Sequence, residues 1–186
     1  MGCEESSYTP KPLGYFRIDL PEKEYQHYSG SCPYNFDYPV RSLLDTMSQR
    51  AQEKCWVNLH YPQHRATIHL TYVGVDGNNL DEYLEDSRNM AMKHTVRADA
   101  IEEQFFQNPE KRVYGLIYNF EGNTATNFQF FLTDSTDHFL SGSMYFNVAP
   151  NSDSLEPVSA YIKEDLRRLI ESFSWDYGNG AGQKPA

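Results

Sequence analysis

The chain has 186 residues, a length that suits one domain able to bury about 70 per cent of the surface its unfolded form exposes. It carries 26 acidic and 16 basic residues and a formal net charge of −10, which repels phosphate backbones and argues against a nucleic-acid partner. No run of about 20 apolar residues occurs, so the sequence offers no candidate for a membrane-spanning helix.

Cys3 stands ahead of a polar, proline-rich stretch, so its thiol has no apolar neighbours to pack against. Three interpretations are open. Cys3 is the lipidated first residue of a mature bacterial lipoprotein whose signal sequence has been replaced, a palmitoylated cysteine beside a myristoylated Gly2, or an unmodified thiol. Either lipidated form anchors the chain to a membrane without crossing it. Residues 1–13 are then expected to form an extended tether.

Alternating apolar and polar residues predict a first strand over residues 15–20, which Pro21 ends. The same period of two predicts short strands at 25–28 and 34–38, near a sheet edge because glycine and proline residues surround them. Residues 41–54 are polar and remain ambiguous between a loop and one or two helical turns.

The next elements are a hairpin and a helix. Residues 56–61 and 66–73 are rich in β-branched and aromatic residues on either side of a short polar turn, which predicts two paired strands. A helix is expected from about residue 79 to 97, capped by Asn78-Asn79. Its apolar stripe comprises Leu80, Leu84, Ser87, Ala91, His94 and Ala98.

The second half predicts four consecutive strands and a final helix. Short polar turns between the strands imply antiparallel neighbours, and the last helix, over residues 155–173, has one apolar face that should pack across the sheet. Since strands are consecutive, the fold class is α+β with a mainly antiparallel sheet covered by helices. We expect one domain over residues 14–176 and a disordered tail over 177–186. The four strands are predicted at 100–106, 111–120, 125–133 and 139–148.

Cys32 and Cys55 either pair in a disulfide or leave Cys55 as a buried free thiol at a strand start. In an oxidising compartment, the bridge would contribute about 3 kcal/mol through loop closure. Neither cysteine has the clustered spacing of a zinc site.

Histidines of the predicted hairpin invite a metal-site interpretation. His60 and His64 bracket the turn, whereas His69 is expected to face the opposite side of the sheet. A three-histidine site is therefore geometrically awkward, and neither a metal nor a cofactor is expected.

Two polar clusters could carry chemistry or contacts. His94 falls on the apolar helix stripe near Asp99, where an imidazole could meet a carboxylate, although a buried structural histidine is the commoner case. Adjacent Glu102 and Glu103 on a strand point to opposite faces and cannot act as a carboxylate pair. No catalytic residue is assigned. The candidate interaction residues are His94, Arg97, Asp99, Glu102, Glu103, Asp134, Ser135, Thr136 and His138.

Six segments stand out when they are taken together: Tyr8-Thr9-Pro10-Lys11-Pro12, Gly14 to Pro21, Cys32-Pro33-Tyr34, Lys93-His94-Thr95, Ala98 to Glu103 and Phe130 to Thr136. In combination they resemble the gliding-motility lipoprotein family GldD of Bacteroidetes. The resemblance runs from Cys3 to about Trp175 and implies that Cys3 is lipidated. It also implies an envelope location and a part in gliding motility, coupled in that phylum to type IX protein secretion. The strand and helix order is similar to the Mog1/PsbP-like sandwich.

These observations lead to one leading hypothesis and one alternative. The leading hypothesis is a lipid-anchored, non-enzymatic envelope protein, expected on the periplasmic side, that docks onto other envelope proteins of the motility and secretion machinery. The alternative is an envelope domain that binds or hydrolyses a small molecule in a pocket near His94 and Asp99.

Overall fold

The computed structural model describes residues 20–46, 55–77, 79–148 and 152–178. Cys3, the tether over residues 1–13 and the strand predicted over 15–20, apart from Leu20, lie outside the described residues, as does the predicted tail from residue 179 onward. No helix in the described ranges has the length and apolar character needed to cross a membrane.

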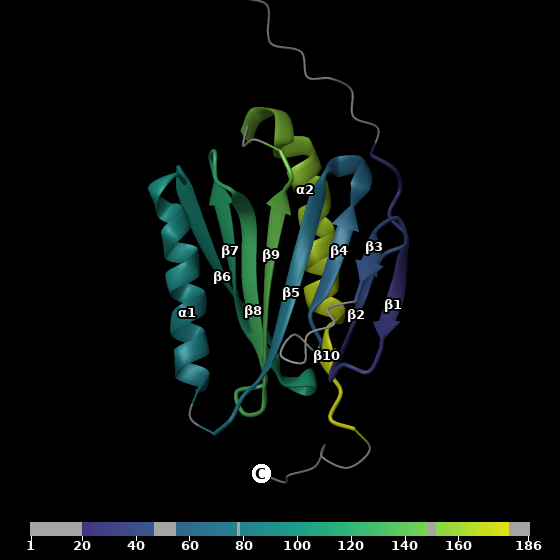
Figure 1. The fold of residues 1–186 in the computed structure, drawn as a ribbon, viewed down its shortest axis with the longest axis vertical. Coiled ribbons are helices and arrows are strands. Elements are labelled where there is room, and N and C mark those ends of the chain that lie inside the picture. The colour runs from purple at the N-terminus through teal and green to yellow at the C-terminus, as the bar shows by residue number, and fades with distance from the viewer. Residues whose placement is uncertain (1–19, 47–54, 78, 149–151, 179–186) are drawn as a thin grey trace, which may run out of the picture.

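Seven antiparallel strands form the main sheet, in the order β3-β4-β5-β9-β8-β7-β6 (Figure 1). The hairpin and the four-strand meander predicted from alternation are both confirmed, as is the mainly antiparallel α+β class. The strands are β3 (Leu43–Asp45), β4 (Val57–Tyr61), β5 (Ala66–Gly74), β6 (Ala100–Asn108), β7 (Val113–Glu121), β8 (Thr126–Thr133) and β9 (His138–Phe146).

Two helices, α1 (Leu80–Lys93) and α2 (Ser152–Ser172), cover opposite faces of this sheet (Figure 1). Phe139 of β9 stacks on Tyr83 of α1, with ring centroids 5.6 Å apart. The next residue, Leu140, is fully buried in the core that contains Ile162 of α2. Because successive side chains of a strand point to opposite faces, α1 and α2 must lie on different sides.

The predicted apolar face of α2 builds the main core. Its side chains are buried against Leu59, Ile68 and other alternate residues of the large sheet. Each fully buried aliphatic side chain of this kind stabilises the fold by roughly 1.5–3 kcal/mol. The buried members of the face are Val158, Ile162, Leu166, Leu169, Ile170 and Phe173.

A smaller sheet of β1 (Tyr25–Ser29), β2 (Tyr34–Pro39) and β10 (Ser174–Trp175) packs beside α2. Tyr34 is fully buried and stacks on Phe173 with ring centroids 5.9 Å apart. β10 was not predicted, since two residues carry no detectable period. Tyr177, assigned to the tail from sequence, instead packs on the domain and donates its OH to Asp134 at 3.1 Å.

The first helix follows its prediction in all but its cap. A 3-10 turn, η2 (His94–Val96), continues α1, and every residue of the predicted apolar stripe is at least half-buried. Asn79 stands at the N-cap position, but its side chain makes no capping hydrogen bond. Its Oδ1 accepts from the N–H of Asp76 at 2.9 Å and its Nδ2 donates to the OH of Tyr83 at 3.2 Å, so the cap expected from Asn79 was wrong. Asn78, the other residue of the expected cap, lies outside the described residues.

The three histidines of the β4–β5 hairpin do not gather on one side of the sheet. His60 pairs with Thr67 and His69 pairs with Asn58, so His60 and His69 share the face opposite the main core. His64 instead meets Tyr161 of α2, on the core side, with ring centroids 5.6 Å apart. His69 therefore faces away from His64, as expected from the sequence, but shares its face with His60. Within the described ranges, no three His, Cys, Asp or Glu side chains are grouped to hold a metal ion.

Candidate functional site

The first cluster of predicted interaction residues lies where α1 ends and β6 begins. His94 is half-buried and meets Phe120 edge-on, with ring centroids 5.5 Å apart, and burial lowers the pKa of its imidazole. Its carbonyl oxygen accepts the N–H groups of Arg97 and Ala98, both at 3.1 Å. His94 therefore helps to end the helix, while the Arg97 side chain is exposed.

Asp99 lies between the end of this helix and the first residue of β6. Its N–H donates to the carbonyl oxygen of Glu121 at 2.9 Å. Its carboxylate lies so close to Gly122 that a Cβ there would be 2.6 Å from Oδ2. Gly122 also has a φ of +96°, a backbone conformation that favours glycine. Both the nearby carboxylate and this conformation therefore require glycine at position 122.

β6 is the edge strand of the large sheet and carries the two adjacent glutamates. Glu103 pairs with Tyr118, which is buried with Ala91 of α1 in a small apolar cluster on the α1 side. Glu102 lies on the α2 side, where its charge acts on Lys163. The prediction that they point to opposite faces is confirmed. Phe105, on the same strand, is 84 % exposed. The outer edge of β6 pairs with no other strand in the described part of the chain.

The second cluster is a turn organised around the carboxylate of Asp134, which is 2 % exposed. Oδ1 accepts the N–H groups of Thr136, Asp137 and His138 at 2.9–3.0 Å. Oδ2 accepts the hydroxyl of Tyr177 at 3.1 Å and has Arg112 3.9 Å away. Burial opposes the charge of Asp134, but these backbone N–H groups hold its pKa below the ordinary value.

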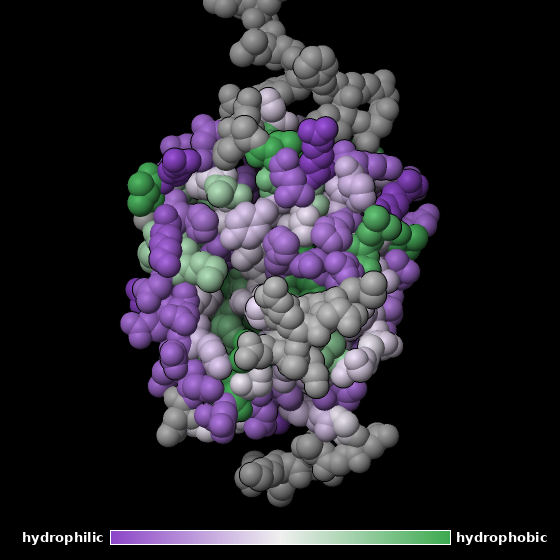
Figure 2. Space-filling view, viewed as in Figure 1, coloured by the Kyte–Doolittle hydropathy of each residue, from purple (hydrophilic) through white to green (hydrophobic). Residues whose placement is uncertain are grey.

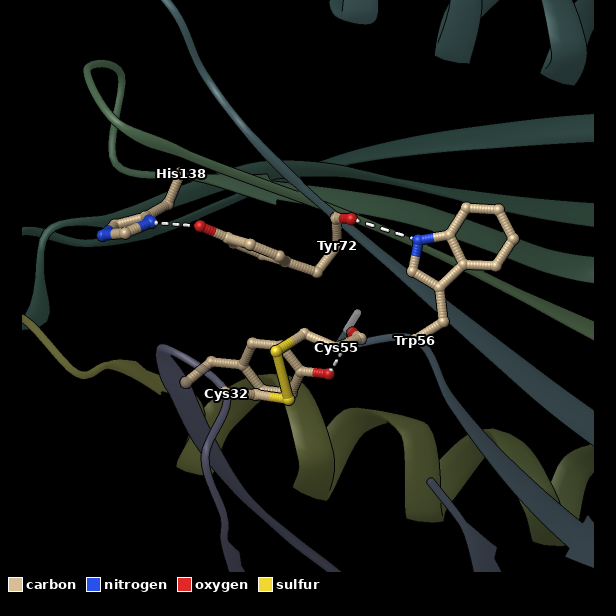
Figure 3. The surroundings of a disulfide bond; sticks show 6 residues. Cys32, Cys55, Trp56, Tyr72 and His138 are labelled. Atoms are coloured by element: carbon tan, nitrogen blue, oxygen red, sulfur yellow. Dashed lines mark hydrogen bonds between the residues drawn. A yellow bond between two sulfur atoms is a disulfide. The ribbon is translucent and has the colours of Figure 1, made fainter. Parts of the chain in front are cut away.

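His138 extends this turn into an aromatic cluster. Its ring stacks on Trp175 with centroids 5.1 Å apart, its Nδ1 hydrogen-bonds the OH of Tyr72 at 2.9 Å, and burial lowers its pKa. The backbone carbonyl of Tyr72 accepts the indole N–H of Trp56 at 3.2 Å, next to the Cys32–Cys55 disulfide (Figure 3). Asp134 and His138 therefore connect this turn to Tyr177, Trp175 of β10 and Tyr72 of β5.

The structure does not bring the two clusters together. Ala100 pairs with Glu121 at one end of the β6–β7 ladder and Asn108 pairs with Val113 at the other. Thr133, the residue before Asp134, pairs with Tyr114 near that second end. The clusters thus lie at opposite ends of the sheet, and the exposed part of the second one is limited to residues 135–137.

Sequence reasoning missed two features. The exposure of Phe105 follows from the edge position of β6, and strand order cannot be read from alternation. A cavity of about 140 Å³ lies between α1 and the sheet, lined in part by Tyr83 and Gln129. The alternative hypothesis placed a pocket near His94 and Asp99, neither of which lines this cavity. A signal for the cavity was present: Gln129 interrupts a run of aromatic residues in β8.

Over its described residues, the chain is an α+β domain in which two antiparallel sheets pack with α1 and α2. It belongs to the gliding motility lipoprotein GldD family, whose profile matches residues 5–175, so the resemblance seen in the sequence is confirmed. No curated protein matches the chain. Among solved structures, it is similar to the solution structure of cyanobacterial PsbP (CyanoP) from Synechocystis sp. PCC 6803. The identity is 14%, the TM-score 0.46, and the match covers 89% of this chain and 99% of that one.

Proposed function

We propose that this chain is a non-enzymatic protein-interaction component of the gliding motility and type IX secretion machinery. In this proposal, lipid on Cys3 holds it to a membrane with the domain on the periplasmic side. Membership in a family of gliding motility lipoproteins, over residues 5–175, is the observation that carries the proposal. Anchoring to a surface raises the effective concentration of weakly binding partners, which suits a scaffold.

The non-enzymatic part of the proposal is supported by how the suspected chemical groups are used. Asp134 directs both carboxylate oxygens to hydrogen bonds within the domain. His138 is held between Tyr72 and Trp175, and His94 rests on Phe120. Groups held in this way stabilise a fold and are poorly placed to transfer protons to a substrate.

The outer edge of β6 is the docking surface that the geometry supports best. Nine residues of regular strand present one row of backbone N–H and C=O groups, which can pair with an added strand. Phe105 offers a large apolar side chain beside that edge. Glu102 and Glu103 are exposed on the two faces and give the edge negative charge. We therefore assign to it an extended partner segment that carries basic residues.

Charge reversal on β6 tests this assignment. The double variant Glu102→Lys/Glu103→Lys should lose co-purification of gliding and secretion components from solubilised membranes while remaining in the membrane fraction. The matched control is Glu82→Lys/Glu85→Lys, which reverses two exposed charges on α1 and should retain those components. If the β6 variant captures the same components as the unaltered protein, the edge is not the docking surface.

The anchor is tested separately. Cys3→Ser removes the thiol that would carry lipid and should move the protein from the membrane fraction to the soluble fraction without changing its circular dichroism spectrum. An unaltered membrane fraction would contradict lipid attachment at Cys3.

A further inference from the structure

The cavity between α1 and the large sheet has a floor made by two paired strands. Gln129 of β8 pairs with Ser143 of β9, and Ser141 lies two residues away on the same face. Tyr83 and Met90 line it from α1. Its volume is about 140 Å³, and Figure 2 shows apolar residues deep in a hollow of this face of the molecule.

Gln129 is the unusual member of this lining. It is 5 % exposed, and its amide nitrogen Nε2 has no hydrogen-bond partner among the described residues. A buried donor left unpaired destabilises the folded protein, and the buried amides of native proteins are nearly always paired. Because Gln129 lines the cavity, a ligand there that offers an acceptor would satisfy this donor.

The rest of the lining restricts the chemistry of such a ligand. The walls are largely apolar, with Val73, Tyr83 and Phe139 around the floor. Among the described residues that line the cavity, Asp86, on the exposed face of α1, is the charged one, and none is a cation. An anionic ligand would meet Asp86 without a compensating charge, so an uncharged ligand fits best.

We propose that this cavity binds a small uncharged molecule with an apolar ring and a carbonyl group. The carbonyl oxygen accepts a hydrogen bond from Nε2 of Gln129, and the ring packs between Tyr83 and Met90. The volume suits one ring, since an engineered apolar cavity of about 150 Å³ in another protein binds benzene. The site is independent of the β6 edge and of the proposed docking function.

Three probes of matched shape test the proposal by NMR on the full domain. Benzamide has the ring and the carbonyl, benzoate adds a negative charge, and toluene lacks the acceptor. Benzamide should shift the Met90 methyl signal and the side-chain amide signals of Gln129, with a Kd on the order of 1 mM for so small a ligand. Benzoate should leave both signals unchanged, and toluene should bind at least tenfold more weakly than benzamide.

Two variants separate specific binding from cavity filling. Gln129→Met removes the donor at similar volume and should weaken benzamide about tenfold while leaving toluene binding unchanged, a difference of about 1.4 kcal/mol. Ser87→Phe extends an α1 side chain into the cavity and should abolish binding of both. Glu103→Lys, on β6, is the control and should bind benzamide normally. The proposal fails if benzamide leaves the signals of Met90 and Gln129 unshifted, or if Gln129→Met binds benzamide as well as the unaltered protein does.

Discussion

Lys23 and Asp165, 142 residues apart in the sequence, form an ion pair with Nζ 2.6 Å from Oδ1. Asp165 is 2 % exposed, and Lys23 also lies 3.8 Å from the centre of the Tyr161 ring. The hydroxyl of Tyr161 donates to the carbonyl oxygen of Pro21 at 3.1 Å. These contacts fasten the segment that enters the domain to the middle of α2.

Removing the cation of this pair should destabilise the domain. Lys23→Met leaves the Asp165 carboxylate buried without its counter-charge, so the free energy of unfolding should fall by about 3 kcal/mol in urea denaturation at neutral pH. Lys93→Met, at an exposed position near the end of α1, is the control and should change it by less than about 0.5 kcal/mol. Equal losses in the two variants would show that the pair contributes nothing specific.

Reduction of the Cys32–Cys55 disulfide should also lower stability. The bridge spans a sequence separation of 23 and restricts the unfolded chain, which corresponds to about 3 kcal/mol. Dithiothreitol should therefore move the urea midpoint of the unaltered protein to lower concentration. The variant Cys32→Ser/Cys55→Ser should show the lower midpoint with and without dithiothreitol. A midpoint that does not respond to reduction would contradict the bridge.

Asp134 should make the fold sensitive to acid. Its folded-state pKa lies below the value of about 3.9 typical of an unfolded chain, so its stabilising effect is present above that value. As the pH falls through this range towards the folded-state pKa, the unfolded chain binds more protons and the stabilisation is lost. Urea denaturation between pH 7 and about pH 3 should show this loss.

The Asp134→Asn variant isolates that contribution. It should be less stable by about 2 kcal/mol at neutral pH, because the charged acceptor of three N–H groups is gone, and its stability should fall less steeply with acid. Asp137→Asn, at an exposed position in the same turn, should keep the original slope. An unchanged slope in Asp134→Asn would contradict the assignment.

Gly115 should not tolerate a methyl group. A Cβ at this position would lie 2.1 Å from the backbone carbonyl oxygen of Phe131, so two neighbouring strands would have to separate. Gly115→Ala should lower the free energy of unfolding by about 2–3 kcal/mol in thermal or urea denaturation. Gly74→Ala is the matched control, because its Cβ would find its nearest neighbour, the OH of Tyr72, at 3.9 Å. Similar melting temperatures for both variants would contradict this account.

Local periodicity accounts for what could be foreseen of the fold. The hairpin, the four-strand meander and both helices were predicted because the pattern of apolar side chains repeats every two residues in a half-buried strand and every 3.6 in a helix. The mistaken expectation was of another kind. The Asn79 cap depends on which hydrogen-bond partners its side chain meets, and a local period does not specify them.

For the candidate site, too, the sequence predicts local relations between residues but not those that depend on the fold. Adjacent Glu102 and Glu103 were assigned to opposite faces from sequence alone, because that relation is local. The placement of β6 at the sheet edge and the exposure of Phe105 were not predictable, since both result from the order in which distant strands pair. Gln129 stood out in the sequence of β8, but only the packing of α1 on the sheet shows that it lines a cavity.

By itself, the amino-acid sequence determined the kinds of element, the face of each helix that is buried, the family and the residue types available for contact. Tertiary structure alone decided that the Asp134 carboxylate is enclosed by its own turn, that Lys23 reaches Asp165, and that the outer edge of β6 pairs with no other described strand. The physical reason is range: side-chain periodicity follows from geometry between neighbours along the chain, whereas burial, ion pairing and edge exposure depend on segments that meet only when the chain is folded.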